Sequence, residues 1–246
     1  MKPDLEIAPP RGTGRTMPRR EFLRALSVLV AAGATGQSFL AADYARADDQ
    51  AAQFFPDGIK SGDPTPGGAV IWTRVATENA ERVAVLWSVA EDALMQNVVR
   101  GGFRLVDAST GHNLHVKVRG LRPDRWYHYR FEVKGVGSVV GRLRTAPRTF
   151  SSPDHLRYAF ASCQQRTQSH YVAHRAIANE NVDFLLHLGD YIYASDSGTQ
   201  TVEDYRGVYQ RFHSNPELQA LQAQVPLVAV WDDGEFYNGV DRTGDP

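Results

Sequence analysis

The sequence predicts a β-sandwich followed by an α/β region, and three features support this division. Strand-like apolar runs recur regularly from residue 48 to about residue 148, with stretches rich in glycine and proline between them. The segment TAPR at residues 145–148 then interrupts any strand, because proline cannot donate to a sheet ladder. After this linker, strand-like runs alternate with helical patterns, which favours a mainly parallel sheet.

The first half contains several strand signals. Residues 69–75 (AVIWTRV) and 83–89 (VAVLWSV) are strand-like, and the turn-rich segment SGDPTPGG precedes the first of them. Residues 121–131 alternate in period two, and their Leu-x-Pro followed by tyrosine resembles the tyrosine corner of fibronectin type III-like sandwiches. In that corner the Tyr hydroxyl bonds back to the backbone. We therefore expect residues 48–148 to form a small sandwich of this kind.

The second half contains two helix signals. Residues 171–178 suit a helix. Asn215 is a suitable N-cap for another, with Pro216 in its first turn. The polar segment 194–200 (ASDSGTQ) is expected to be a loop over the site. The predicted apolar face of the first helix consists of Val172, Ala173, Ala176 and Ile177.

The run VDFLLHLGDYIY at residues 182–193 carries the strongest functional signal. Its apolar strand ends in Gly189 and Asp190, where open α/β sheets place their ligands. Gly189 allows a turn that other residues resist, so Asp190 and Tyr193 are able to face one cation. His187 lies inside the strand, and we interpret it as a hydrogen-bonded histidine of the core or of the site's surroundings rather than as a ligand.

Two further strands end in groups that bind cations. Residues 156–161 deliver Cys163, and residues 225–231 lead into an acidic segment. Soft and hard ligands together fit a transition metal beside a harder ion better than calcium or magnesium alone. Adjacent side chains on an extended chain point in opposite directions, so only one of the two neighbouring aspartates is expected to reach the metal. The acidic side chains are Asp232, Asp233 and Glu235.

These motifs resemble the alkaline phosphatase D (PhoD-like) family within the calcineurin-like metallophosphoesterases. The resemblance runs from about Phe55 to the end of the chain, and it implies a partial metallophosphoesterase domain at residues 149–246. The matching segments are FASC at 160–163, HLGDYIY at 187–193, DYRGVYQRF from Asp204 and WDDGE at 231–235.

The resemblance implies a two-metal phosphomonoesterase or phosphodiesterase that holds iron and calcium, with other divalent metals as alternatives. Cys163 and Tyr193 would hold the iron, and Asp190 would bridge the two ions. Asp233 would hold the second ion. Asp232 and Glu235 would then support the site without binding an ion. The expected substrate is a phosphate ester, and we expect a monomer.

One position departs from the family pattern. The last block usually reads Trp-Asp-Asp-His-Glu, and Gly234 replaces the histidine that protonates the leaving group or steadies the phosphoryl group in related enzymes. Loss of a general acid typically costs ~10²–10⁴ in rate. Family members also continue beyond this block, where later histidines complete the metal shell, so the chain looks like the front portion of such an enzyme. The alternative is a catalytically silent, truncated relative that acts as a binding or structural module.

Residues 1–47 are interpreted as a twin-arginine signal peptide. Residues 19–24 (RREFLR) precede an apolar stretch at 25–40, and Ala45-Arg46-Ala47 offers a small-x-small cleavage site. The stretch is too short and too rich in small polar residues to span a bilayer stably. We therefore expect the twin-arginine export machinery as a partner, a periplasmic or secreted location and no membrane span after processing.

Composition limits the partners further. The hydrophobic fraction of 42% with 22% charged residues is ordinary for a globular protein. The formal net charge of −1 provides no basic field, so nucleic acid is not an expected partner. Cys163 is the single cysteine, which excludes an internal disulfide. In an exported protein, metal ligation is a reason to keep such a cysteine.

Overall fold

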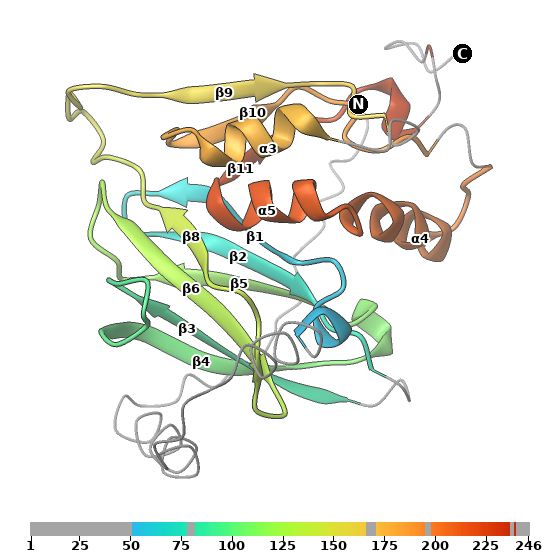
Figure 1. The fold of residues 1–246 in the computed structure, drawn as a ribbon, viewed down its shortest axis with the longest axis horizontal. Coiled ribbons are helices and arrows are strands. Elements are labelled where there is room, and N and C mark those ends of the chain that lie inside the picture. The colour runs from blue at the N-terminus through green and yellow to red at the C-terminus, as the bar shows by residue number, and fades with distance from the viewer. Residues whose placement is uncertain (1–50, 78–81, 166–170, 195–197, 237–238, 240–246) are drawn as a thin grey trace, which may run out of the picture.

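The computed structural model describes residues 51–77, 82–165, 171–194, 198–236 and 239 (Figure 1). The signal peptide expected at residues 1–47 lies outside these ranges, as does most of the C-terminal stretch after residue 236. Among the described residues, no helix combines the length and the apolar character needed to cross a membrane.

One layer of the fold is a five-stranded antiparallel sheet with the order β4-β3-β6-β7, in which β8 also pairs with β6. Along β6, half-buried and buried residues alternate strictly, so one face of the strand packs on the core. The strands of this sheet are β3 (Val83–Ala90), β4 (Val98–Val106), β6 (Trp126–Val133), β7 (Val136–Gly137) and β8 (Gly141–Arg144).

The second layer is a six-stranded sheet with the order β5-β2-β1-β11-β10-β9. Strands β1, β2 and β5 complete the sandwich, and β11, β10 and β9 run parallel to one another. The two groups join where β1 pairs in parallel with β11, with Gly62 opposite Leu227. The strands are β1 (Ile59–Thr65), β2 (Gly68–Arg74), β5 (Asn113–Arg119), β9 (Tyr158–Ala161), β10 (Phe184–His187) and β11 (Leu227–Ala229).

The fold class is thus confirmed: a β-sandwich precedes an α/β region (Figure 1). The expected strands at 69–75 and 83–89 correspond to β2 and β3, whereas β9 and β11 are shorter than expected. Because one sheet continues across the boundary expected at residues 148 and 149, the two halves are joined by strand pairing as well as by the linker. The boundary itself stays a prediction.

The tyrosine corner is confirmed by its hydrogen bond. The Tyr127 hydroxyl accepts the backbone N–H of Arg122 at 2.9 Å, and the ring is buried. It lies in a core that fills the space between the two sandwich sheets, with Ile71, Val85 and Phe131 among its fully buried members.

Within the described part of the chain, three α-helices follow the sandwich: α3 (Val172–Asn179), α4 (Val202–His213) and α5 (Pro216–Gln224). Helices α3 and α5 cover one face of the parallel strands (Figure 1). The predicted cap is confirmed, because Asn215 Oδ1 accepts the N–H groups of Glu217 and Leu218 at 2.9 and 3.1 Å. Helix α4 was not expected, although Thr201 and Asp204 form a capping box at its start.

The predicted apolar face of α3 is wrong. Its buried side chain is His174, and Val172 is 65% exposed. The rotation of the helix follows from polar contacts: the Tyr171 hydroxyl donates to the Gln164 carbonyl at 3.0 Å, and His174 stacks on the Tyr171 ring. Ile177 is half-buried on the same side.

Candidate metal centre

The three parallel strands end at one edge of the sheet. His187, the last residue of β10, lies opposite Ala161 of β9 and Ala229 of β11. The chain segments that leave this edge carry Cys163, Asp190 and the acidic segment from Asp232, so the sheet itself brings the predicted residues together.

Two tight turns at this edge are hydrogen-bonded to each other. The Cys163 N–H donates to the Gly189 carbonyl at 3.2 Å, and the Gln164 N–H donates to the Asp190 carbonyl at 3.1 Å. Cys163 and Asp190 both adopt left-handed backbone conformations, with φ of 55° and 53°. Strained conformations of this kind in residues other than glycine cluster at functional sites.

Gly189 is required by the same turn. Its φ is +108°, and a β carbon at this position would lie 2.4 Å from the β carbon of Asp232. Only glycine therefore allows β10 to turn this close to the segment that follows β11.

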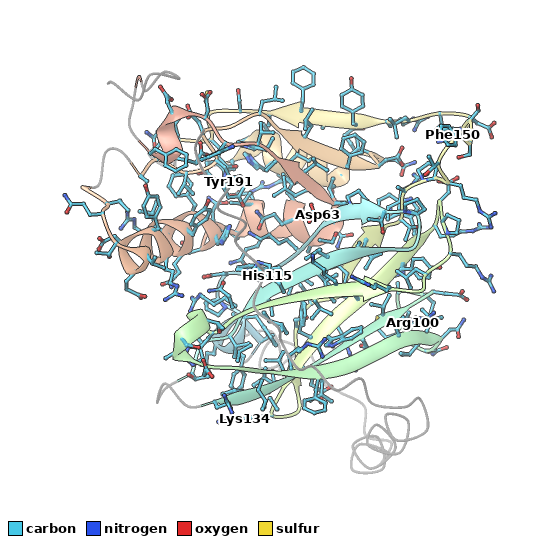
Figure 2. All side chains as sticks on the ribbon, turned by 180° about the vertical axis from the view of Figure 1, so that it is seen from behind. Asp63, Arg100, His115, Lys134, Phe150 and Tyr191 are labelled. Atoms are coloured by element: carbon cyan, nitrogen blue, oxygen red, sulfur yellow. The ribbon has the colours of Figure 1, made fainter. Side chains whose placement is uncertain are left out.

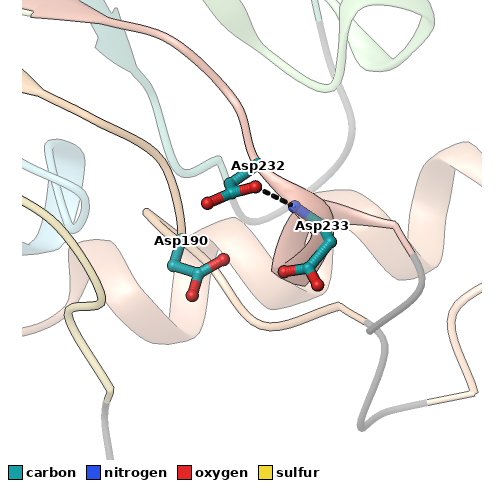
Figure 3. Close-up of side chains that lie close together, drawn as sticks. All are labelled: Asp190, Asp232 and Asp233. Carbon is teal, nitrogen blue, oxygen red and sulfur yellow. Dashed lines mark hydrogen bonds between the residues drawn. The ribbon is translucent and has the colours of Figure 1, made fainter. Parts of the chain in front are cut away.

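Three carboxylates share a small volume at the strand ends. Oxygens of Asp190, Asp232 and Asp233 all lie within 4.8 Å of one another (Figure 3). The Asp233 N–H donates to Asp232 Oδ1 at 3.0 Å. The two neighbouring aspartates were expected to point in opposite directions, but Asp233 begins the short 3-10 helix η3 (Asp233–Glu235), so the chain is not extended there. The mutual repulsion of such carboxylates is relieved by a cation, and oxygen ligands of this type fit a hard ion.

Tyr193 connects this acidic group to the cysteine. Its hydroxyl donates to Asp190 Oδ2 at 3.1 Å, and its side chain also contacts that of Cys163. Burial, the Asp190 carboxylate and the neighbouring thiol all raise the pKa of Tyr193. A phenol that holds its proton this firmly would bind only a strongly Lewis-acidic cation such as ferric iron. Cys163 is exposed and stands outside the group of three carboxylates, next to the phenol.

Glu235 has a role that its position in the sequence does not reveal. Its buried carboxylate accepts the backbone N–H groups of Asp190, Tyr191 and Ile192 at 3.2, 2.5 and 3.3 Å. It also accepts the N–H of Asp232 at 2.8 Å. One side chain thus fixes the turn after β10 relative to the turn after β11, and it has few lone pairs left for a metal.

Gly234 is buried against the same carboxylates. Its N–H donates to Asp190 Oδ1 at 3.1 Å, and its carbonyl accepts the N–H of Ala194 at 2.9 Å. A β carbon here would lie 2.4 Å from Asp190 Oδ1 and 3.0 Å from its Cγ. The site is therefore built around a residue without a side chain.

His187 is a histidine of the core, as expected, but the hydrogen bonds expected of it are missing from the described part of the chain. The side chain is fully buried, and neither ring nitrogen has a hydrogen-bond partner among the described residues. Burial lowers the pKa of His187 to about 4, and His174 adds to the effect, while Glu235 and Asp190 oppose it. The ring packs edge-on against Tyr191, with 5.1 Å between centroids.

Gln164 is a residue of this centre that no sequence pattern predicted. This buried side chain donates to the Tyr191 carbonyl at 2.7 Å and pairs with His174 Nε2 at 2.9 Å. It thereby connects the cysteine turn both to helix α3 and to the turn after β10. Its place directly after Cys163 was the available signal.

The fold agrees with the comparisons to known proteins. Residues 40–147 match the family described as PhoD-like phosphatase, N-terminal domain, and residues 158–243 match the family described as PhoD-like phosphatase. Alkaline phosphatase D of Bacillus subtilis (strain 168) is 33% identical over 249 residues, which cover 91% of this chain and 43% of that protein.

A solved structure described as the structure of PhoD superposes with a TM-score of 0.73 at 33% identity. The match covers 78% of this chain and 41% of the solved chain. This protein thus spans about two fifths of the length of both relatives. With both family matches in chain order, and with the fold shared, the chain belongs to the PhoD-like phosphatase family.

Proposed function

We propose that this chain carries the metal-binding core of an exported, metal-dependent phosphoesterase. The observation that supports the proposal most strongly is the meeting of a phenol, a thiol and three carboxylates at one edge of a parallel sheet in a chain of a phosphatase family. Such a mixed donor set suits one softer and one harder cation, as in two-metal hydrolases.

Within the proposal, Cys163 and Tyr193 would hold iron, Asp190 would serve both ions, and Asp233 would hold calcium or another divalent ion. When bound, such cations supply Lewis acidity and compensate the charge of a phosphoryl group. The protein's own part is preorganisation. Glu235 fixes the turn that carries Asp190, and the Gly234 N–H orients one oxygen of that carboxylate.

A second candidate function is a catalytically silent member of the family that still binds metal. One observation favours it: Gly234 has no side chain that could donate a proton, and a side chain in its place would have to displace the Asp190 carboxylate. In this case the chain binds cations but does not turn over esters.

Metal analysis combined with an ester assay distinguishes the two candidates. The purified chain would be loaded with iron and calcium, dialysed and analysed for bound metal, and its visible spectrum would be recorded for a phenolate-to-iron band. Tyr193→Phe should abolish the band, whereas Tyr209→Phe, on α4, should keep it. Bound iron with hydrolysis of a chromogenic phosphate ester supports the hydrolase, and bound iron without hydrolysis supports the silent relative. Absence of bound iron overturns the iron site in both.

Export is tested separately. A reporter fused to residues 1–47 should reach the periplasm in a bacterial host, and replacing Arg19 and Arg20 by lysine should retain it in the cytoplasm. Export that persists without both arginines would argue against the twin-arginine route.

A further inference from the structure

A polar cavity lies between the sandwich and helix α4, outside the candidate metal centre. Its volume is about 250 Å³. Strands β1 and β2 contribute Lys60, Trp72 and Arg74, and α4 contributes Arg206 and His213. His115 of β5 lines the same cavity, and Figure 2 labels it together with Tyr191.

The lining of this cavity carries more positive than negative charge. Three cationic side chains face it, and Asp57 is its one acidic lining residue. Asp57 is already engaged: it is buried and accepts two hydrogen bonds from the Arg74 guanidinium, at 2.5 and 3.0 Å. Arg206 pairs with Glu203 at 3.2 Å, but that carboxylate is exposed and does not line the cavity.

Lys60 is the cation whose charge is least compensated. Among the described residues it forms no ion pair. Its Nζ lies 4.1 Å from the centre of the Trp72 ring and 3.3 Å from His213 Nε2. Burial lowers the pKa of Lys60 to about 8, although Asp57 opposes the shift. A cation–π contact contributes ~0.5–2 kcal/mol, whereas burying an ion costs several kcal/mol.

His213 adds a polar atom that has no partner in the described part of the chain, its ring nitrogen Nδ1. The side chain is 2% exposed and lines the cavity, and its Nδ1 has no hydrogen-bond partner among the described residues. Its Nε2 faces both Lys60 Nζ and the Tyr191 hydroxyl, the latter at 3.0 Å. Burial together with Lys60 and Arg74 keeps the pKa of His213 well below its usual value, so the ring is neutral.

We propose that this cavity binds a small oxyanion of the phosphate and sulfate class. An oxyanion would supply the negative charge that the lining lacks, and ammonium and guanidinium groups are the donors that recognise tetrahedral anions. The volume lies below the range usual for drug-sized ligands, which suits a small ion. The proposal does not depend on hydrolysis, because no candidate metal ligand lines the cavity.

The cavity is nevertheless connected to the candidate metal centre. Lys60 also lines a neighbouring cavity of about 310 Å³, whose walls include Tyr191 and Glu235. Tyr191 follows Asp190 directly, and its N–H is held by Glu235. Lys60 therefore borders both cavities, and the second of them reaches residues next to the turn that carries the predicted ligands.

Calorimetry on the metal-free chain tests the proposal. Removing metals with a chelator leaves three carboxylates at the candidate metal centre, which repel phosphate, so any saturable binding belongs elsewhere. Inorganic phosphate and sulfate should both bind, and chloride at the same ionic strength should not compete. Near pH 8, binding should take up protons, because an adjacent anion raises the pKa of Lys60. Absence of saturable phosphate binding in the millimolar range overturns the proposal.

Matched variants locate the site. Lys60→Met retains an unbranched side chain against Trp72 and should weaken phosphate binding at least tenfold, and Arg206→Gln should weaken it several-fold. Lys134→Met, in the exposed turn between β6 and β7, removes the same charge and should leave the affinity unchanged. Circular dichroism checks that each variant is folded. Should Lys60→Met fail to fold, Arg206→Gln decides the outcome, and a folded variant of either kind with wild-type affinity overturns the proposal.

The source of the oxyanion is distinguished by a second ligand. Glycerol phosphate presents the same phosphoryl group on an ester. Binding of both ligands with the same dependence on Lys60 indicates a site for phosphoryl groups of esters. Binding of inorganic phosphate alone indicates a site for the free ion.

Discussion

The backbone N–H of Gly234 donates to Oδ1 of Asp190, and a β carbon at position 234 would lie 2.4 Å from that same oxygen. The missing side chain of Gly234 leaves space for the Asp190 carboxylate, and the Gly234 N–H holds the carboxylate in that space. The family pattern described above places histidine at this position, and any side chain there requires the Asp190 carboxylate to move.

Gly234→Ala should therefore weaken metal binding. The added methyl group must displace the Asp190 carboxylate, and disturbing the surroundings of a metal ligand typically costs ~10–100-fold in affinity. Titration of the metal-free chain with calcium and iron measures the change. We expect Gly234→His to behave in the same way and to leave turnover low, contrary to what the family pattern alone suggests.

Gly207→Ala is the matched control for this substitution. Gly207 lies within α4 and has nothing within 4 Å of where a β carbon would be placed. Alanine should stabilise the helix by about 0.5–1 kcal/mol and leave metal affinity unchanged. Equal metal affinity in Gly234→Ala and Gly207→Ala would contradict the proposed role of the glycine.

Glu235→Gln should loosen the turn that carries Asp190. The carboxylate accepts four backbone N–H groups, and an amide presents one acceptor oxygen and an NH₂ group that faces donors. Leaving buried donors unsatisfied costs about 1–3 kcal/mol. Urea unfolding measures the loss, and hydrogen exchange at residues 190–192 localises it.

Glu203→Gln serves as the control, since that side chain is exposed on α4 and makes only an i,i+3 pair with Arg206. Surface pairs of this kind have little effect on stability. Unchanged protection of the 190–192 amides in Glu235→Gln would show that the turn is held by other contacts.

Tyr127→Phe tests the sandwich independently of the metal centre. The variant removes the acceptor for the Arg122 N–H and should destabilise the chain by about 1–3 kcal/mol. Tyr158→Phe, on the edge strand β9, removes a hydroxyl from a side chain that is 54% exposed and should have no measurable effect. The midpoints of urea unfolding compare the two, and equal midpoints would argue against the corner as a stabilising contact.

Local signals account for what could be predicted from the sequence. The Asn215 cap and the tyrosine corner each depend on residues within a few positions of one another, and both are present. The meeting of Cys163, Asp190 and Asp232 could also be anticipated, because parallel strands place their carboxyl ends at one edge. The cap and the corner contain both partners of their contact in one short pattern, whereas the meeting at the sheet edge follows from the general rule for parallel strands.

Contacts between distant segments account for what could not be predicted. The pairing of Gly62 with Leu227 joins residues far apart in the chain, and no local pattern encodes it. The rotation of α3 depends on Gln164, which lies outside the helix. The four hydrogen bonds that the Glu235 carboxylate accepts likewise depend on how the turns after β10 and β11 meet in space.

His187 should make the folded chain sensitive to acid. Its pKa is lowered from 6.5 to about 4 in the fold, so the unfolded chain binds a proton at a higher pH than the folded chain does. Stability is therefore retained above about pH 6.5 and lost as the pH falls toward 4, by at most about 3 kcal/mol from this residue.

His187→Phe keeps an aromatic ring against Tyr191 and removes two unpartnered nitrogens, so it should match or exceed the parent in stability at pH 8. It should also lose less stability between pH 6.5 and 4 in urea unfolding of the metal-free chain, whereas His155→Phe at an exposed position should keep the parent's profile. His174 and His213 are shifted in the same direction, so part of the decline should remain; a decline as steep as that of the parent would show that His187 does not contribute.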